Sequence, residues 1–566
     1  MVWKLKDIDI SLSQNIQKNF NIKRSIAEFL VTRGIKSLEE ADFFINPHLS
    51  KIPHPDLMKD LKKAVDRLIS AIKKREKIAI YGDYDADGIT ACALLVLFLK
   101  DIGADVTYYI PCRINEGYGL NISAIDKLKE KGVSLIITVD CGIRDFSAVD
   151  YANNLGLDIV ITDHHLPEEK LPNAIAIINP KRKDCSFPFK ELAGVGVAFY
   201  LLIELRTQLR KLGVFNNRKE PNLREYLDLV AIGTIADMVP LTGPNRIFVK
   251  YGLEEINKTK KRGLKILRED LLIDTLDVRS ISFRMAPRIN ASGRVSSPLE
   301  ALNLLLTSDE EKAKELVKSL NDSNKKRQSL VEKALTSAIK MLEDTEEQFI
   351  YCLYSSEWHQ GILGIIASKL MEKFNRPFMI FTDAEAGLLK GSARSVESLP
   401  LDIILEQAKH LLVEYGGHKL ACGLSIYKER LAEFSKVIND VVKKTLKEPL
   451  FCSYLEIDSE IFIDEIDNKF FEDIKLLEPF GFGNEEPIFL LKDVDVVNAR
   501  SVGSQENHLK LYLKKANTFF NAIGFSLSNN GVSENSKLDL IGIPKITEYN
   551  GQKRWDFYIR DYMVKR

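Results

Sequence analysis

The stretch that decides the fold is Ile78-Ala-Ile-Tyr-Gly-Asp-Tyr-Asp-Ala-Asp-Gly88, an apolar run that ends in three alternating aspartates. Two more apolar, β-branched runs end in a similar way: Leu135 to Val139 is followed by Asp140, and Ile159 to Thr162 by Asp163-His-His165. Runs of this kind, bounded by Gly and Asp, are typical of buried parallel strands. Because the carboxyl ends of parallel strands line one crevice, we expect these side chains to converge there.

The predicted crevice gathers carboxylates and imidazoles in a pattern that suits metal binding. Asp83, Asp85 and Asp87 alternate on an extended segment and therefore point the same way, and Gly88 lets the chain turn into a helix. Mixed Asp and His ligation favours Mn²⁺ or Mg²⁺ over Ca²⁺. An EF-hand is not expected, because Leu94 occupies the position where that loop needs a glutamate. Two such ions, roughly 3.5 to 4 Å apart, predict phosphoester or phosphoanhydride hydrolysis.

A fourth candidate ligand is Asp237, which interrupts the apolar stretch Gly233-Thr-Ile-Ala-Asp-Met-Val-Pro240. Taken alone, Asp237 and Asp140 could each be a helix cap instead. The sequence contains neither the G-x-x-x-x-G-K-[ST] loop of ATP-driven motors nor the G-x-S-x-G elbow of serine hydrolases. The metal-dependent hydrolase is therefore the enzyme class that the motifs favour.

Composition and length set broader limits. The chain has 566 residues, of which 45% are hydrophobic, so we expect three or four domains. Lys plus Arg and Asp plus Glu both number 80, so the overall charge does not indicate a polyanionic partner. The seven cysteines never form C-x-x-C, which argues against a disulfide framework and a zinc cluster. With no long apolar run and no leader pattern, we expect a soluble cytoplasmic protein.

The pattern of apolar residues divides the chain into five segments. Residues 1–60 form a small helical N-terminal layer, and residues 61–305 alternate strand and helix signals, which predicts a parallel α/β sheet. Residues 306–345 predict one long connecting helix, and residues 346–450 a second α/β domain. Residues 451–566 predict a small antiparallel β-barrel or β-sandwich, where aromatic residues interleaved with basic ones suit nucleic-acid binding. The alternative is that these aromatic residues are simply the core of the barrel.

Four motifs resemble those of the DHH phosphoesterases in order and spacing: Gly82–Ala91, Asp140-Cys-Gly142, Asp163-His-His165 and Gly233–Asp237. Trp358-His-Gln-Gly361 and Gly416-Gly-His418 resemble the DHHA1 domain that accompanies the DHH domain in one branch. Further stretches resemble the RecJ family of bacterial single-strand-specific 5′-to-3′ DNA exonucleases: Asn46-Pro47, Glu116–Gly119, Pro287–Arg294 and Leu477–Asn484. This resemblance implies a multidomain α/β protein with a DHH domain, a connecting helix, a DHHA1 domain and a C-terminal OB-like barrel.

The resemblance also implies roles for single residues. The implied metal ligands are Asp83, Asp85, Asp87, Asp140, His164 and Asp237. The implied catalytic residues are His165, which contacts the scissile phosphate, with Asp163 behind it and Asp140. The implied substrate-binding residues are Arg113, Ser392 and Arg394 for the 5′ phosphate, Arg288, Asn290 and Arg294 for the path of the strand, and His359, Gly416, Gly417 and His418 from the DHHA1 domain. For the glycine pair, a common tight turn is the alternative.

The expected function is a two-metal exonuclease, with Mn²⁺ favoured over Mg²⁺, that releases 5′ mononucleotides from single-stranded DNA during repair and recombination. Its expected partners are the 5′ end of a single strand, a single-strand-binding protein and a repair helicase, with no membrane, and the expected state is a monomer. One alternative is a DHH/DHHA1 phosphodiesterase for short oligonucleotides or cyclic dinucleotides. Another is a catalytically inactive scaffold that binds single-stranded DNA.

Overall fold

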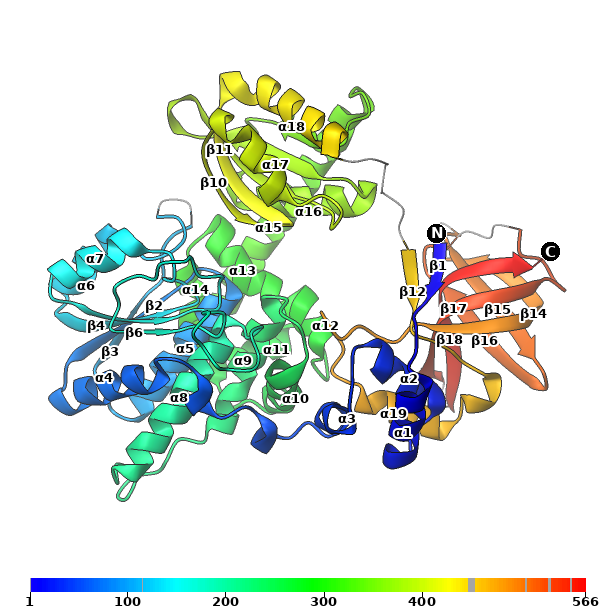
Figure 1. The fold of residues 1–566 in the computed structure, drawn as a ribbon, viewed down its shortest axis with the longest axis horizontal. Coiled ribbons are helices and arrows are strands. Elements are labelled where there is room, and N and C mark those ends of the chain that lie inside the picture. The colour runs from blue at the N-terminus through cyan, green and yellow to red at the C-terminus, as the bar shows by residue number, and fades with distance from the viewer. Residues whose placement is uncertain are drawn as a thin grey trace. The chain divides into compact units, whose positions relative to one another are not determined.

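The computed structural model describes residues 2–113, 116–445, 454–503, 506–527, 531–549 and 552–565. The contacts divide the chain into two compact units (Figure 1). The first comprises Met1–Pro53, Met238–Lys250 and Ser453–Arg566, and the second His54–Asp237 and Tyr251–Cys452. The described helices contain none that is both long and apolar enough to cross a membrane.

A five-stranded parallel sheet forms the first half of the second unit. Its strands lie in the order β3-β2-β4-β5-β6, and every neighbouring pair is parallel, as the apolar runs predict. Their bounds are β2 Lys77–Gly82, β3 Val106–Tyr109, β4 Val133–Val139, β5 Asp158–Thr162 and β6 Ala176–Ile178. Because all five strands run the same way, the three acidic and histidine motifs follow strand ends at one edge of the sheet.

Helices cover both faces of this sheet, which explains why its strands are apolar on both sides. Tyr81, Ile136 and Ile159 pack in one core cluster with residues of α6 (Ile122–Glu130) and α7 (Phe146–Asn154). The opposite face is covered by α4 (Leu61–Lys74), α5 (Ala86–Asp101) and α8 (Gly194–Lys211). Helix α5 is buried along almost its whole length, and α9 (Leu227–Ala236) packs against it.

Helices link this sheet to the second α/β part of the same unit. They are α11 Arg262–Asp270, α12 Val278–Ser280, α13 Ala286–Val295, α14 Pro298–Leu306 and α15 Glu310–Glu343, and they follow α10 Gly243–Ile256, whose residues up to Lys250 belong to the first unit. Helix α15 is the predicted long connecting helix, and it runs unbroken through its polar middle, where Ser323 and Asn324 are buried.

The second α/β part is a mixed five-stranded sheet in the order β10-β11-β9-β8-β7. Its strands are β7 Tyr351–Tyr354, β8 Phe378–Asp383, β9 Leu388–Arg394, β10 Leu412–His418 and β11 Ala421–Tyr427. One face packs on α17 (Leu401–Ala408) and α18 (Leu431–Thr445), and the other on α15 and α16 (Leu363–Phe374). Ser392 and Arg394 therefore lie on β9, while Gly416, Gly417 and His418 lie at the end of β10.

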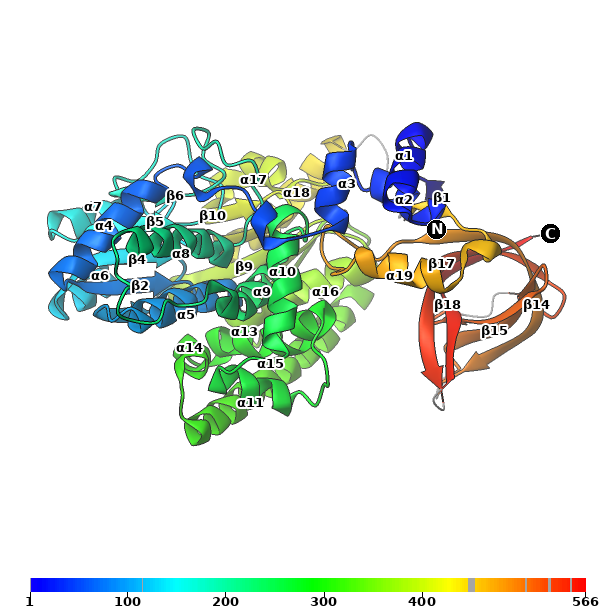
Figure 2. The same cartoon turned by 90° about the horizontal axis from the view of Figure 1, so that it is seen from below.

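The first unit is built around a β-barrel (Figure 2). Strands follow the order β13-β14-β15-β16-β18-β17, and an additional pairing of β14 with β17 closes the barrel. Its strands are β14 Phe489–Val502, β15 His508–Lys515, β16 Thr518–Gly524, β17 Lys537–Tyr549 and β18 Gln552–Lys565, with the short β13 Ser459–Glu460 alongside. The prediction of a C-terminal barrel is confirmed.

The N-terminal helices belong to the same core as the barrel. Phe29 of α2 and Phe44 of α3 share one hydrophobic cluster with Phe470 of α19 and with the inner face of the barrel. Strand β1 (Val2–Leu5) also pairs in parallel with β12 (Tyr454–Ile457). The helices are α1 Ile10–Phe20, α2 Arg24–Thr32, α3 Leu38–Ile45 and α19 Asn468–Leu476.

Two glycine substitutions, one in α9 and a control in α8, test how tightly α9 packs against α5. A Cβ added at Gly233 would clash with Thr90 Oγ1 and lie 2.7 Å from Asp87 Oδ1, so Gly233→Ala should lower the free energy of unfolding by about 1–3 kcal/mol. A Cβ at Gly196 in α8 would meet Leu192 atoms only at 3.5 and 3.7 Å, so Gly196→Ala should raise it by about 0.4–1 kcal/mol. Thermal unfolding of both variants checks this, and shifts of the same sign would contradict the packing argument.

Candidate metal centre and phosphate-binding site

The carboxylates and the first histidine of the predicted metal shell come together at the edge of the parallel sheet. Three overlapping groups each place their ligand atoms within 4.8 Å of one another. The groups are Asp83 with Asp85 and Asp140, Asp87 with His164 and Asp237, and Asp140 with His164 and His165. All six predicted metal ligands therefore meet in one cluster. Strand ends explain why Asp83, Asp140 and His164 do so, and the end of α9 brings Asp237 to them.

Local geometry turns each side chain into the cluster. Asp85 caps the N-terminus of α5 by accepting from the Asp87 and Gly88 amides, which fixes the turn of the first motif. Asp140 adopts φ 63°, a left-handed conformation that Asp tolerates better than most residues, directly after β4. A Cβ at Gly194 would lie 2.7 Å from the Asp140 side chain, so only glycine allows α8 to begin so close.

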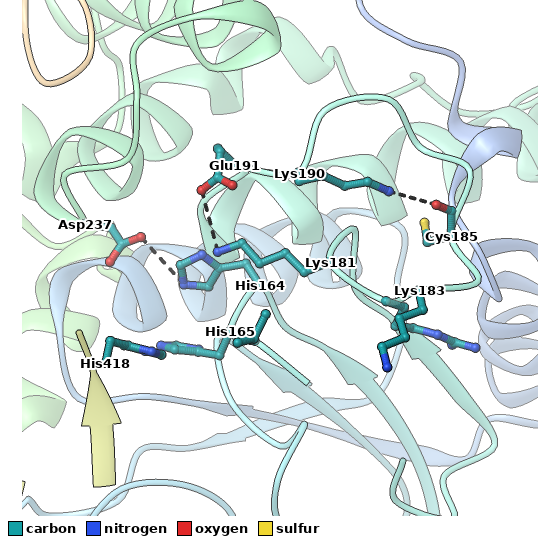
Figure 3. Close-up of a pocket in the computed structure, with 11 residues that line it drawn as sticks. His164, His165, Lys181, Lys183, Cys185, Lys190, Glu191, Asp237 and His418 are labelled. Carbon is teal, nitrogen blue, oxygen red and sulfur yellow. Dashed lines mark hydrogen bonds and ion pairs between the residues drawn. The ribbon is translucent and has the colours of Figure 1, made fainter. Parts of the chain in front are cut away.

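The distances within the cluster are short. His164 Nε2 lies 3.1 Å from Asp140 Oδ1 and 3.6 Å from Asp237 Oδ2, and Figure 3 shows the second of these contacts. Burial lowers the pKa of His164 to about 3, which favours the neutral imidazole that a metal ion needs. Asp237 stands at the C-terminal end of α9, where the helix dipole disfavours a negative charge. Asp140 begins no helix, because the next helix, α7, is capped by Asp145. Asp140 therefore does not act as a helix cap. Asp237 is the C-cap residue of α9, as the alternative explanation has it, and it also lies in the cluster.

Burial and mutual repulsion make the ionised carboxylates costly in this place. Burial, with Asp87 and Asp85, raises the pKa of Asp140 well above its usual value, and burial with Asp85 raises that of Asp83. Burial also raises the pKa of Asp87 to about 7, although the amides of Gly194 and Val195 donate to it. Among the described residues, nothing donates a hydrogen bond to the buried Asp83 Oδ1 or Asp140 Oδ1. These oxygen-rich, unsatisfied positions fit hard divalent cations.

His165 is held by Asp163 and Tyr118. Asp163 Oδ1 lies 2.8 Å from His165 Nδ1, and the same carboxylate accepts from the amides of Ile143, His164 and His165. Burial opposes ionisation of Asp163, but its bond to His165 lowers its pKa to about 2. Burial likewise opposes protonation of His165, yet Asp163 raises the pKa of that imidazole. The Tyr118 hydroxyl lies 3.1 Å from the same Nδ1 atom, so both contacts orient this nitrogen of the ring.

Arginines gather at the end of the cluster that carries Asp83 and Asp85. Arg113 lies over the Tyr84 ring at 5.1 Å, and Arg394 donates to Ser392 Oγ and to the Ala393 carbonyl. Burial, Arg113 and Arg327 lower the pKa of Arg294 to about 9, and burial and Arg113 lower that of Arg394. Burial is the larger cause of both falls in pKa, and the contribution of Arg113 to each shows that these guanidiniums lie near one another. Such a group suits a phosphate with two or more negative charges.

Other predicted substrate-binding residues are engaged with the protein. Asn290 Oδ1 accepts from the Ala86 amide, Arg288 donates to Asn321 Oδ1 and the Arg284 carbonyl, and His359 Nδ1 accepts from the Gly361 amide. His418 lines the cavity beside His164 and His165 (Figure 3). Gly417 has φ 155°, and a Cβ there would lie 2.6 Å from Cys422 Cα, so the glycine is required by close pairing with β11.

Comparison with known proteins places these parts in one family. Family models match at residues 77–234 (DHH family, N-terminal domain), 346–444 (DHHA1 domain) and 457–561 (RecJ OB domain). The single-stranded-DNA-specific exonuclease RecJ of Bacillus subtilis is 36% identical over 100% of this chain and 71% of its own length. That of Haemophilus influenzae is 37% identical over 88% of each chain.

The chain belongs to the RecJ family.

A solved structure agrees with this assignment. The crystal structure of RecJ in complex with Mn²⁺ from Thermus thermophilus has a TM-score of 0.84 at 29% identity and covers 100% of this chain and 80% of that one. The predicted family and the predicted fold class, with DHH and DHHA1 domains and an OB barrel, are confirmed. The five segment boundaries and the roles of the individual site residues stay predictions.

Sequence reasoning missed one part of this RecJ-family site. Asn179, Lys181 and Glu191 follow β6, the fifth parallel strand, and Lys181 and Glu191 line the cavity beside His164. The strand-end argument that found the other motifs applies to β6 as well, but residues 179–191 carry no run of carboxylates or histidines to mark them.

Metal binding should stabilise this protein through Asp140. At a free Mn²⁺ concentration of 100 times the dissociation constant, we expect about 2.7 kcal/mol of added stability, seen as a higher Tm. Asp140→Asn should raise the Tm of the metal-free protein, because a buried and repelled charge is removed, and should lose most of the Mn²⁺-induced rise. Asp145→Asn, at a half-buried carboxylate outside the cluster, is the control and should keep that rise. An equal Mn²⁺ effect in both variants would contradict the assignment of Asp140.

Proposed function

We propose that this chain is a Mn²⁺- or Mg²⁺-dependent exonuclease that cuts single-stranded DNA from its 5′ end and releases 5′ mononucleotides. The observation that carries the proposal is the buried carboxylate and histidine cluster with unsatisfied oxygens, set beside a group of neighbouring arginines. The names of the relatives, all single-stranded-DNA-specific exonucleases, support the substrate class. Solved RecJ structures in complex with Mn²⁺ and with Mg²⁺ support the choice of ions.

The residues of this chain divide the chemistry between them. When bound, a pair of divalent ions lowers the pKa of a water molecule and stabilises the leaving oxygen. Asp83, Asp85, Asp87, Asp140, His164 and Asp237 would hold the pair. His165, kept cationic by Asp163, would donate to an oxygen of the scissile phosphate and offset its developing charge. Gly416 and Gly417 with His418 would contact the backbone phosphate from the side of β10.

The 5′ end would be recognised by the arginines. Arg113 and Arg394, with Ser392 between the sheet and α16, offer planar donors that match a terminal phosphate. This phosphate lies one nucleotide from the scissile bond when a mononucleotide is released. Arg294, Arg288 and Asn290 on α13, with His359, would complete the wall of this part of the site.

Selectivity for single strands follows from burial of the metal ligands. Asp83, Asp140 and His164 are 4%, 2% and 6% exposed, so the scissile phosphate must enter a recess. A paired strand cannot deliver its phosphate there without unpairing its end. Contacts to phosphates rather than to base edges would leave the reaction tolerant of sequence.

The remaining expectations join this proposal. We propose that the enzyme acts in DNA repair and recombination in the cytoplasm, since the relatives named above are bacterial. Its proposed partners are a single-strand-binding protein and a helicase. We propose that the enzyme itself is a monomer. The OB barrel would bind the strand, which separates this enzyme from a hydrolase of cyclic dinucleotides. Because every predicted ligand position is filled, the inactive scaffold is the weaker alternative.

Loss of a metal ligand should abolish hydrolysis. Asp85→Ala should lower kcat for a single strand by at least about 10³-fold, or about 4 kcal/mol in the activation free energy, while circular dichroism stays unchanged. The assay uses a long strand labelled at either end and the matching duplex, with Mn²⁺. Release of mononucleotides from the 5′ end of the single strand alone is expected. Cutting confined to oligomers of a few nucleotides would favour the small-substrate hydrolase, and no cutting by the unmodified chain would favour the scaffold.

Removal of a residue from the proposed 5′-phosphate pocket should change the preference for a 5′-phosphorylated end of the strand. Arg394→Ala should weaken the preference for a 5′-phosphorylated over a 5′-hydroxyl strand by about 10- to 100-fold, because a charge-assisted bond is worth about 1.5–3 kcal/mol. Arg430→Ala, at an arginine of the same domain that donates to the His410 carbonyl, is the control. An unchanged preference in Arg394→Ala would remove Arg394 from the pocket.

A further inference from the structure

A cavity of about 880 Å³ opens beside His164 and His165, at the end of the cluster that carries Asp237 (Figure 3). The loop between β6 and α8 forms much of its lining and contributes Lys181, Lys183 and Lys190. None of these lysines has a role in the site described so far. Lys183 is exposed, and Lys181 and Lys190 are half-buried.

Hydrogen bonds hold this loop in a defined conformation, so the backbone that carries its lysines is fixed in position. The fully buried Asn179 donates from Nδ2 to the His165 carbonyl and accepts from the Lys181 amide. Arg182, 7% exposed, donates to Asp60, to Asp184 and to the Ile177 carbonyl. Lys190 Nζ donates to the Cys185 carbonyl. Asn179 thus joins the start of this loop directly to the backbone of His165.

Lys181 acts on the metal ligands from this side. Burial, Asp87 and Asp85 raise the pKa of Asp237, and Lys181 opposes them. At the other end of the cluster, Arg113 opposes the raised pKa of Asp83 in the same way. The acidic cluster therefore lies between two cationic groups, arginines at one end and lysines at the other.

The lysine group carries more positive charge than its surroundings neutralise. Of the residues that line the cavity, Glu191 is the one acidic side chain outside the metal cluster, and it lies 3.7 Å from Lys181 Nζ. Arg182 is already paired with Asp60 and Asp184. Within the described residues, no ion pair within 4.0 Å is found for Lys183 or Lys190. The cavity wall is thus suited to an anion that bears several charges.

We propose that Lys181 and Lys183, with Lys190 beside them, bind backbone phosphates of the DNA strand on the 3′ side of the scissile bond. This rests on the proposed function. A strand whose scissile phosphate lies at the metal cluster has neighbouring phosphates on both sides, and the cluster has a cationic group at each end. The arginine group is half-buried and suits a chain end, whereas Lys183 is exposed, as a path for a long strand requires. The two groups together give the bound strand its direction.

The test compares substrates of different length. A 5′-phosphorylated dinucleotide has a terminal and a scissile phosphate but none beyond, whereas a 20-nucleotide strand continues past the lysines. We expect Lys183→Ala, which leaves Lys181 in place beside Asp237, to lower kcat/KM about three- to tenfold on the long strand, with a much smaller loss on the dinucleotide. The slope of log kcat/KM against log salt for the long strand should become shallower by about 0.7 for the one lysine removed. Lys183→Arg should restore most of the loss, because it keeps the charge.

Controls separate the possible failures. Lys211→Ala, at an exposed lysine at the end of α8, should leave both substrates unaffected, and the Tm of each variant checks folding. If the unmodified chain does not cut the long strand, the proposed function fails. If it does, equal losses on both substrates, or an unchanged salt slope, would overturn the role of the lysines. A weaker inhibition by product mononucleotide, with kcat/KM on the long strand unchanged, would also overturn it by making the lysines a product site.

Discussion

Repulsion among buried carboxylates is the constraint on which the rest of this structure depends. Asp83, Asp87, Asp140 and Asp237 lie in a place that water hardly reaches, which raises the pKa of each, and the nearby carboxylate of Asp85 raises all four further. A fold tolerates this only if rigid elements force the groups together and cations can neutralise them. The ends of the parallel strands position most of these groups. Helix α9 positions Asp237 by packing through Gly233 against α5.

Glycine and helix geometry explain how the helices come so near. At Gly194, α8 starts against the Asp140 side chain, and its first amides donate to Asp87. The positive end of that helix therefore faces the most crowded carboxylates. Asp237, in contrast, lies at the negative end of α9. Part of the repulsion is relieved by the protein and part is left for bound ions, which keeps the site both foldable and able to bind metal.

The sequence predicted well those features that depend on strand ends and on motifs, namely the parallel sheet and the edge at which its acidic residues gather. The apolar runs before Asp83, Asp140 and His164 located the sheet edge, because a buried parallel strand must be apolar on both faces. It did not reveal the shared core of Phe29, Phe44 and the barrel, since no local pattern records which distant segments cover each other. It also missed Lys181, since ordinary lysines in a loop look the same whether they face solvent or a metal site. Only the position of Asn179, bonded to the His165 backbone, distinguishes this loop.

Residues of helix α13 that belong to a sequence motif contact other parts of the protein and thereby position them. Asn290 accepts from the Ala86 amide in the turn that carries Asp83, Asp85 and Asp87, and a Cβ at Gly293 would lie 2.6 Å from the Tyr84 carbonyl oxygen. One residue further on, Arg294 donates to the Gly361 carbonyl at the start of the DHHA1 domain. A single helix therefore ties that turn to the domain that carries Arg394. These contacts of α13 set the separation between the metal cluster and the arginines, and a constant separation is what an enzyme needs if it is to release products of one constant length.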